Sequence, residues 1–256
     1  MSYRIIQPCE ELKDFVSHFW AGRWNDFGKP NSYYFSTANI QTELAFAFHT
    51  SPNKPYSELI FSTILGHTEK FRQFPMNGNM DLFGVSLFSH AVPCLFNIST
   101  SELTDQVINL DTLLDDQGKT INEKMSNAIT AEKRLEVLSG YFKAQLVKGR
   151  FEDRLIIKSI KQIKRNQGIV NINDLASEVC LSQKQFERRF VEYSGFNPKL
   201  YARIIRFEAA LWDRRSYNTL TGVAHAYGYY DQAHFIRDFK IFSGFSPTKF
   251  FSLTGY

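Results

Sequence analysis

Apolar positions follow two different periods along the chain, and the change between them falls near residue 150. Before it, short stretches rich in aromatic and β-branched residues are separated by Pro, Gly or Asn, which is typical of strands. The predicted strands are residues 32–37, 42–49, 59–65, 70–74 and 81–88. After it, apolar residues recur every three or four positions, which predicts helices. The pattern predicts an α+β protein with two domains, residues 1–150 and 151–256.

Helical patterns also follow the predicted strands within the first domain. Residues 91–96 and 102–107 are expected to form short helices. Residues 122–147 are expected to form a helical pair that breaks near Thr130, which can cap a new helix. We therefore expect a small β-barrel or sandwich with trailing helices, followed by an all-α domain.

One sequence pattern occurs twice in the second domain, 49 positions apart. The shared positions are Phe186, Phe190, Gly195, Phe196, Pro198 and Tyr201 in the first copy, and Phe235, Phe239, Gly244, Phe245, Pro247 and Phe250 in the second. Such a repeat indicates that one supersecondary unit is used twice. Each copy follows a short apolar helix pattern and a tight turn, so the domain is expected to be a tandem helix-turn-helix.

The second helix of each predicted unit carries side chains that could read DNA. Ser182 and Asp231 are suitable N-caps, which places these helices at about residues 182–194 and 231–243. The candidates to face a DNA groove lie outside the Phe stripe. They are Gln183, Lys184, Glu187, Arg188 and Arg189 in the first helix, and Gln232, Ala233, His234 and Arg237 in the second.

A long helix is predicted between the two copies, over residues 198–215. Its exposed side would carry Arg203, Arg206, Arg214 and Arg215. At roughly 1.5 Å per residue it would span about 27 Å. Two reading helices held apart in this way could reach sites near the ~34 Å repeat of B-DNA.

The second copy also carries a run of particular residues at set offsets. The run comprises residues 228–235, 237–240 and 244–247, and Phe250. It resembles the DNA-binding domain of the AraC family of transcription regulators, and the resemblance covers about residues 153–255. It implies sequence-specific binding by two recognition helices in successive major grooves. It further implies that the DNA contacts fall on Lys184, Glu187 and Arg188 and on Ala233, His234 and Arg237. Relatives often carry a polar residue at the position of Ala233, so readout there would be weaker.

Charge is divided unevenly between the two domains. Residues 151–256 hold 16 Lys and Arg against 10 Asp and Glu, a net charge of +6. Residues 1–150 hold 14 against 16, a net charge of −2, and the sum is the +4 of the whole chain. A basic surplus attracts a polyanion and makes its binding salt-dependent. The expected partner of the second domain is double-stranded DNA.

Several short segments of the first domain look like the N-terminal regions of a subgroup of AraC-type regulators whose ligand is unassigned. They are residues 66–67, 84–88, 95–98 and 102–107. The resemblance implies a sensing or oligomerising domain. A ligand pocket would be lined by inward aromatic residues, although most such residues are simply core. The candidates are Trp20, Trp24, Phe46, Phe48, Phe61 and Phe83.

The last predicted helix of the first domain has an apolar stripe with two ordinary uses. The stripe consists of Leu135, Leu138, Phe142 and Leu146. In the AraC family such helices often mediate dimerisation, which would make the protein a homodimer. Packing back onto the strands is equally common, and the sequence leaves both open.

Membrane and secreted proteins are disfavoured by the sequence. No window approaches the run of about 18 apolar residues that a membrane helix needs, and the first residues start no signal peptide. We expect a soluble cytoplasmic protein with no membrane partner. Cys9, Cys94 and Cys180 are widely spaced among apolar residues, which fits reduced core thiols.

Enzymes and metal proteins are also disfavoured. His49, His67 and His90 are too far apart for a local metal-binding motif. The sequence has no Gly-rich phosphate loop and no nucleophile motif of the hydrolase type. We therefore expect no metal, no cofactor and no enzymatic activity.

Two functions from different classes remain. In the first, the protein is a transcription regulator whose first domain binds a small-molecule effector, which changes how the recognition helices are presented. As an activator it would also contact RNA polymerase. In the second, the first domain is a dimerisation or protein-interaction module without a ligand, and DNA binding is constitutive. A buried apolar cavity with one or two polar groups would favour the first, and a filled barrel with a flat exposed patch the second.

Overall fold

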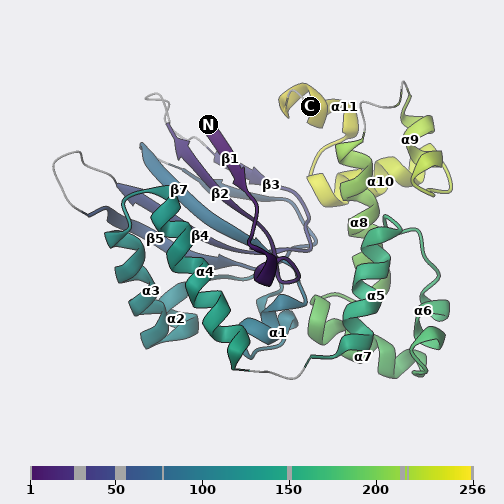
Figure 1. Ribbon diagram of the computed structural model, residues 1–256. Helices are drawn as coiled ribbons and strands as arrows, with labels where there is room; N and C mark the ends of the chain where they lie inside the picture. Colours follow the sequence, from purple (N-terminus) through teal and green to yellow (C-terminus); the bar gives the residue numbers. More distant parts are fainter. Residues whose placement is uncertain are drawn as a thin grey trace. The chain divides into compact units, whose positions relative to one another are not determined.

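The computed structural model of this 256-residue chain describes residues 2–25, 33–49, 56–76, 78–148, 152–213, 217 and 219–254. They form two compact units (Figure 1). The first, which we call the sheet unit, comprises Met1–Tyr34, Gln41–His67 and Pro75–Glu152. The second, the helical unit, comprises Phe35–Ile40, Thr68–Phe74 and Asp153–Tyr256. The helical unit thus takes in two segments that the predicted division near residue 150 assigned to the other domain.

Six strands of the sheet unit form one antiparallel sheet in the order β1, β2, β7, β4, β5, β8. They are β1 (Ser2–Ile6), β2 (Val16–Trp24), β4 (Thr42–His49), β5 (Glu58–Leu65), β7 (Met80–Leu87) and β8 (Val107–Asn109). Two further strands, β3 (Tyr33–Ser36) and β6 (Arg72–Pro75), form a separate two-stranded sheet. Because successive residues of a strand point to opposite faces, the large sheet has two faces of different composition.

Helices cover one face of the six-stranded sheet (Figure 1). They are η1 (Glu10–Leu12), α1 (Ala91–Phe96), η2 (Thr100–Leu103), α2 (Leu110–Leu114), α3 (Asp116–Asn127) and α4 (Ala131–Val147). Leu138 and Phe142 of α4 are fully buried in one core with Phe46 and Phe83 of the strands. The apolar stripe of α4 therefore packs back onto the sheet. The hydroxyl of Thr130 accepts a hydrogen bond from the Lys133 N–H, so the predicted break and cap are confirmed.

The α+β class is confirmed, and all five predicted strands are present with bounds within two residues. Strands β1, β2 and β8 were not predicted: β8 has three residues, and the run of β2 is interrupted by Gly and charged residues. The prediction of a helix at residues 102–107 is wrong. Ser99 and Glu102 form a capping box that starts η2 instead, and Asp105 with φ of 59° turns the chain into β8.

The helical unit contains two helix-turn-helix motifs joined by one long helix (Figure 1). Its helices are α5 (Arg154–Arg165), α6 (Ile172–Glu178), α7 (Gln183–Ser194), α8 (Pro198–Trp212), α9 (Leu220–Ala226), α10 (Gln232–Ser243) and α11 (Pro247–Thr254). The first motif is α6 and α7, the second is α9 and α10, and α8 connects them. The predicted positions Arg214 and Arg215 lie outside the described residues. Within the described part of the chain, no helix is both long and apolar enough to span a membrane.

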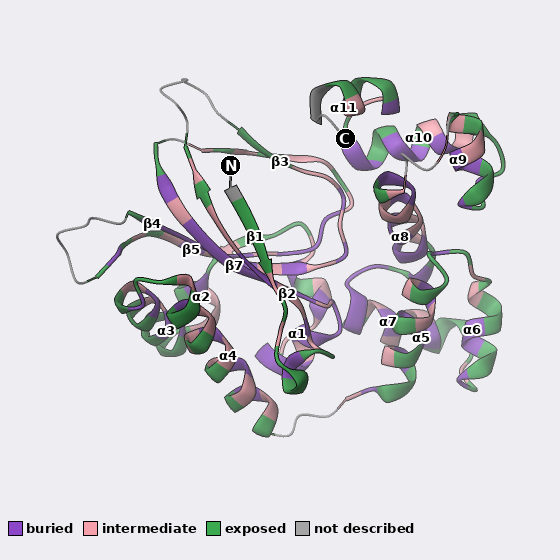
Figure 2. Cartoon of the chain, turned by 45° about the horizontal axis from the view of Figure 1, so that its top comes forward, coloured by how far each residue is buried: buried purple, intermediate pink, exposed green. Residues whose placement is uncertain are grey.

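The sequence repeat is also a structural repeat. Phe186 and Phe190 of α7 and their counterparts Phe235 and Phe239 of α10 are all fully buried, and Figure 2 shows buried residues along both helices. Each recognition helix ends at a left-handed glycine, Gly195 with φ of 78° and Gly244 with φ of 76°. Such a cap suits glycine because it lacks the Cβ that strains this conformation. The two motifs thus share their core positions and the way their second helix ends.

The turn between the helices of each motif also contains a left-handed residue, but the residue types differ. Cys180 has φ of 54° in the first turn, and Gly228 has φ of 65° in the second. We expect Cys180→Gly to raise the free energy of unfolding of the helical unit by about 0.5–1 kcal/mol, because the left-handed conformation strains a residue with a Cβ. Urea denaturation followed by circular dichroism measures this.

Cys9→Gly is the matched control for that variant. Cys9 is also an exposed free cysteine, but its φ is −68°, so glycine relieves no strain there and should give no gain. An unfolding midpoint that falls in Cys180→Gly would contradict the expectation. The exposure of Cys9 and Cys180 also corrects the prediction of core thiols, which holds for Cys94 alone because only that side chain faces the core.

Two short segments from before residue 150 complete the helical unit. Ala38 and Ile40 are buried in the same core as the helices, and the Ala38 N–H donates a hydrogen bond of 2.8 Å to the Phe242 carbonyl. The ring of Phe71 packs edge-on against Phe245, with ring centroids 5.1 Å apart. Apolar side chains of these segments fill space between helices, which is why the unit does not begin at residue 151.

Glu208 of α8 should make the stability of the helical unit depend on pH. Burial raises the pKa of its carboxyl to about 7, against the lowering effects of the Lys164 charge and of a hydrogen bond from the Ile40 backbone. The folded state therefore holds this proton more tightly than the unfolded chain. The stability that the protonated Glu208 carboxyl adds to the folded state is fully present below the ordinary pKa of 4.5. It is lost as the pH rises to about 7.

We therefore expect the urea midpoint of the helical unit to fall between about pH 5 and about pH 7.5, and Glu208→Gln to remove this part of the fall. Asp174→Asn, a change at an exposed carboxylate of α6, should leave the slope of the urea midpoint against pH unchanged. If Glu208→Gln and the parent chain show the same slope, Glu208 does not titrate in this range.

Candidate nucleic-acid interface

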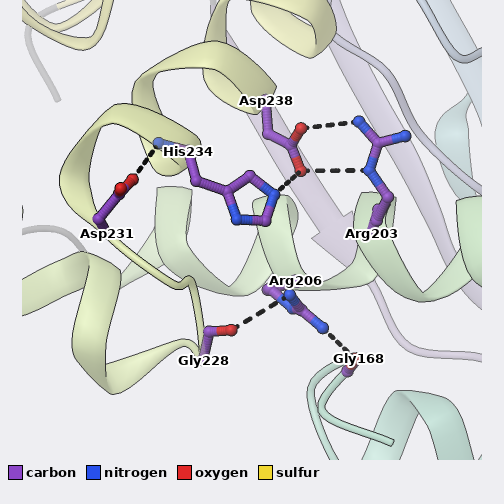
Figure 3. Close-up of polar contacts among 7 residues, drawn as sticks. All are labelled: Gly168, Arg203, Arg206, Gly228, Asp231, His234 and Asp238. Atoms are coloured by element: carbon purple, nitrogen blue, oxygen red, sulfur yellow. Dashed lines mark hydrogen bonds and ion pairs between the residues drawn. The ribbon is translucent and has the colours of Figure 1, made fainter. Parts of the chain in front are cut away.

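Both recognition helices begin at well-formed N-caps. The Ser182 hydroxyl accepts from the Gln185 N–H while the Gln185 side chain accepts from the Ser182 N–H, which is the predicted capping box. In α10 the carboxylate of Asp231 accepts a 2.7 Å hydrogen bond from the His234 N–H (Figure 3). These caps fix the first turns, and the first turn of a recognition helix is the part that enters a DNA groove.

The candidates on α7 form one polar surface. Gln183, Lys184 and Arg188 are exposed, and Glu187 is partly buried. The Gln183 side-chain amide donates to the Glu187 carboxylate at 3.2 Å. Lys184 and Arg188 are four residues apart, hence on one side of the helix, and neither forms an ion pair with any other described residue. Two cationic side chains are thus available to an anionic partner.

On α10 the candidates are arranged differently. Gln232, Ala233 and Arg237 are exposed. The Gln232 side chain accepts a hydrogen bond of 2.8 Å from the Thr221 hydroxyl of α9, which ties the two helices of the motif together. His234 is partly buried, and its Nε2 lies 3.8 Å from the Asp238 carboxylate (Figure 3). Arg237 has no ion-pair partner within the described chain and is the cationic group of this helix.

One predicted candidate on α7, Arg189, makes its contact within the helical unit. Arg189 forms an ion pair of 2.5 Å with Asp153, the N-cap of α5. The equivalent position in the repeat is Asp238 of α10, which pairs with Arg203 of α8 at 2.7 Å (Figure 3). An ion pair therefore ties α7 to the N-cap of α5 and another ties α10 to α8, and the signs of the two charges are reversed between the motifs.

Arg206 joins the two motifs. Its guanidinium donates to the carbonyl of Gly168, after α5, at 3.1 Å and to the carbonyl of Gly228, in the second turn, at 3.3 Å (Figure 3). It also lies over the ring of Tyr229, 5.4 Å from its centroid. Arg203 and Arg206 are both partly exposed on the predicted outer side of α8, but their guanidinium groups are held by a buried carboxylate and by backbone carbonyls of neighbouring elements.

Tyr230 is a surface residue that sequence reasoning did not single out. It stands immediately before the N-cap of α10, and 88% of it is exposed. A large aromatic side chain with a hydroxyl at this place can contact a DNA backbone beside the recognition helix. The signal in the sequence was its position next to Asp231, but only the structure shows its exposure.

The six aromatic ligand candidates in the sheet unit do not line one pocket. Phe46, Phe48 and Phe83 point into the core under the helices, whereas Trp20, Trp24 and Phe61 lie on the other face. Alternation along each strand causes the division. The second group belongs to a buried apolar cluster on the other side of the sheet, which we call the tryptophan face. It consists of Trp20, Trp24, Ala45, Ala47, Phe61, Leu65, Met76, Met80 and Leu82.

The histidines considered for metal binding have ordinary structural positions. His67 is buried, and its Nε2 lies 2.6 Å from the Thr104 hydroxyl. His90 is buried too, and its Nε2 lies 2.8 Å from the Asp14 carbonyl. Among the residues that the structure describes, no group of three or more His, Cys, Asp or Glu is arranged to hold a metal ion.

Two family models match separate parts of the chain. Residues 175–252 match the family model of a helix-turn-helix domain, and residues 4–109 match a domain of unknown function, DUF6597. No curated protein matches the chain.

Solved structures of ToxT from Vibrio cholerae are similar to the whole chain. The structure of ToxT with a bound unsaturated fatty acid is 14% identical, covers 93% of this chain and 96% of that one, and has a TM-score of 0.50. A ToxT structure from strain O395 is 15% identical, covers 95% and 100%, and has a TM-score of 0.47. At such identities the likeness concerns the fold alone.

Proposed function

We propose that this chain, whose C-terminal domain is an AraC-type helix-turn-helix domain, is a transcription regulator that reads DNA with α7 and α10. One observation carries the proposal. Arg188 and Arg237 occupy the same place in the two copies of the repeat, and both are exposed without an ion-pair partner among the described residues. An arginine in this setting can contact a guanine edge with two hydrogen bonds or bind a phosphate.

Other candidates divide into reading and supporting roles. Lys184 is available for DNA in the same way as Arg188. Gln183 and Gln232, again equivalent positions, each make a hydrogen bond that fixes the first turn of their helix. His234 and Ala233 present less polar surface, so α10 would read fewer base edges than α7. Tyr230 would contact the backbone next to α10.

Arg188→Ala and Arg237→Ala should each weaken specific DNA binding by about 1–3 kcal/mol and relax the preference at one base position. Selection from a randomised DNA library identifies the motif, and fluorescence anisotropy on that motif and on random DNA measures the loss. Arg154→Ala is the matched control, because Arg154 is an exposed arginine on α5, outside both recognition helices. An equal loss on random DNA would assign the residue to phosphate contact instead, and no loss would exclude it from the interface.

We further propose that the sheet unit is the sensing part and that its ligand binds at the tryptophan face. The helix-covered face is filled by fully buried side chains such as Phe46 and Phe83. On the tryptophan face, the buried indole N–H groups of Trp20 and Trp24 have no acceptor in the described part of the chain. Buried polar groups of native proteins are usually satisfied, so these donors support a ligand more than a simple interaction surface.

A further inference from the structure

The tryptophan face ends in a row of polar side chains. His18 of β2, Ser86 of β7 and Glu43 of β4 are paired in register across three neighbouring strands. Tyr3 of β1 adds to this end of the face, because its ring stacks on Trp20 with centroids 5.9 Å apart and its hydroxyl lies 3.5 Å from the His18 Nε2. An apolar surface with polar groups at one end suits an amphiphilic molecule that binds in one direction.

Glu43 supplies a carboxyl group that has no cationic partner. Its hydrogen-bond donor is the Ser86 hydroxyl at 3.0 Å, and no Lys, Arg or His of the described residues forms an ion pair with it. Burial raises the pKa of the Glu43 carboxyl. Burial and then the charge of Glu43 raise the pKa of Tyr3. A buried carboxylate is stable only when a positive charge or several donors accompany it.

The tryptophans supply the remaining features of the face. Trp20 is only 8% exposed and lies over Gly84, where a Cβ would come within 2.3 Å of the indole ring. Its Nε1 and that of Trp24 are buried donors without an acceptor among the described residues. The faces of Trp and Tyr rings attract cations through their π-electrons. The same cluster thus combines aromatic rings, a carboxyl group and two N–H donors that have no acceptor among the described residues.

We propose that the tryptophan face binds a small organic cation, with a protonated amine held by Glu43 and Tyr3 and an apolar body with one acceptor oxygen lying along Trp20 and Trp24. This inference rests on the proposed function, because it names the class of ligand for the sensing site. An anion of the fatty-acid type would place a second negative charge beside Glu43, so the site selects against it by charge repulsion.

The test compares three probes that share a ten-carbon tail: decylammonium and decanoate below their micelle-forming concentrations, and 1-decanol below its solubility limit. The full chain carrying Trp212→Phe is used, because Trp20 and Trp24 are then its only tryptophans and fluorescence reports on the tryptophan face alone. We expect decylammonium to bind at least about tenfold more tightly than 1-decanol, and decanoate to bind most weakly.

Glu43→Gln should reduce the preference for decylammonium over 1-decanol to less than about threefold, because the charge is removed at nearly constant shape. Glu123→Gln, at an exposed glutamate of α3, is the matched control and should leave the preference unchanged. Circular dichroism checks the fold of each variant. Should Glu43→Gln not fold, Tyr3→Phe replaces it: it removes the hydroxyl proposed to hold the amine, so the preference for decylammonium should fall, and an unchanged preference would overturn the proposal.

Tighter binding of decanoate than of decylammonium would overturn the proposal. So would a fluorescence response to none of the three probes, or an unchanged preference in folded Glu43→Gln. DNA binding by the same protein is measured in parallel with fluorescence anisotropy. Amine binding without DNA binding would contradict the proposed DNA-binding function but support the proposed ligand site. DNA binding without amine binding would contradict the ligand site alone.

Discussion

Ile40→Ala will destabilise the helical unit by about 2–5 kcal/mol, although the residue precedes that unit's main sequence by more than a hundred positions. The side chain of Ile40 is 1% exposed and lies in one core with residues of α5, α7, α8 and α10. Truncation to Ala removes its apolar contacts and leaves a cavity that helices packed on all sides close only in part. Amide hydrogen exchange in α8 and α10 and urea denaturation measure the loss.

Ile60→Ala provides the comparison for Ile40. Ile60 is an isoleucine of β5 that is half exposed, so its truncation should change stability by no more than about 0.5 kcal/mol. A fragment that begins at residue 151 should show the same weakened protection as Ile40→Ala, because it lacks Ala38, Ile40 and Phe71. Full protection of α8 and α10 in that fragment would show that residues 153–256 suffice for the fold.

Asp238→Ala is expected to cost about 1.5–3 kcal/mol of helical-unit stability. The Asp238 side chain is 2% exposed and accepts two hydrogen bonds from the Arg203 guanidinium, at 2.7 and 3.3 Å (Figure 3). Removal of the carboxylate takes two charge-assisted hydrogen bonds from the partly exposed Arg203 guanidinium, which then lies over the ring of Phe242 without its partner. Thermal unfolding in the absence of DNA checks the loss.

The double variant Arg203→Met with Asp238→Leu distinguishes the loss of the whole ion pair from the loss of the Asp238 carboxylate alone. Replacing both charges by apolar side chains of similar size removes the unpaired charge, so this variant should recover most of the stability lost in Asp238→Ala. Asp174→Ala, at an exposed carboxylate of α6, should cost less than about 1 kcal/mol. If Asp238→Ala costs no more than Asp174→Ala, the ion pair does not support the motif.

The helical unit could be predicted from the sequence in more detail than the sheet unit. The signals that define its elements are local. Ser182 and Asp231 cap the N-termini of α7 and α10, and Gly195 and Gly244 end the same helices. Phenylalanines at helical spacing fill the core. Each of these signals acts within a few residues and is given twice by the repeat. The ion pairs of Arg189 and Arg203 escaped prediction, because their partners, Asp153 and Asp238, are 36 and 35 positions away.

The sheet unit depends on contacts between residues far apart in the sequence. Strand β2 lies between β1 and β7, and this order places Trp20 beside Gly84 and His18 beside Ser86. Periodicity could predict that aromatic residues of the strands are inward, but not on which of two faces each one lies. The division of the six ligand candidates therefore followed only from the register, as did the position of Glu43 next to Ser86.

The reversed charges of the two ion pairs have a consequence for how a duplicated domain folds. Copies of one motif that share core residues could exchange their second helices, so that α7 would dock on α8 and α10 on α5. In that arrangement Arg189 would meet Arg203, and Asp238 would meet Asp153, so both contacts would bring like charges together. The exchanged assembly is thereby disfavoured at two places, and α7 and α10 keep a fixed order along the unit.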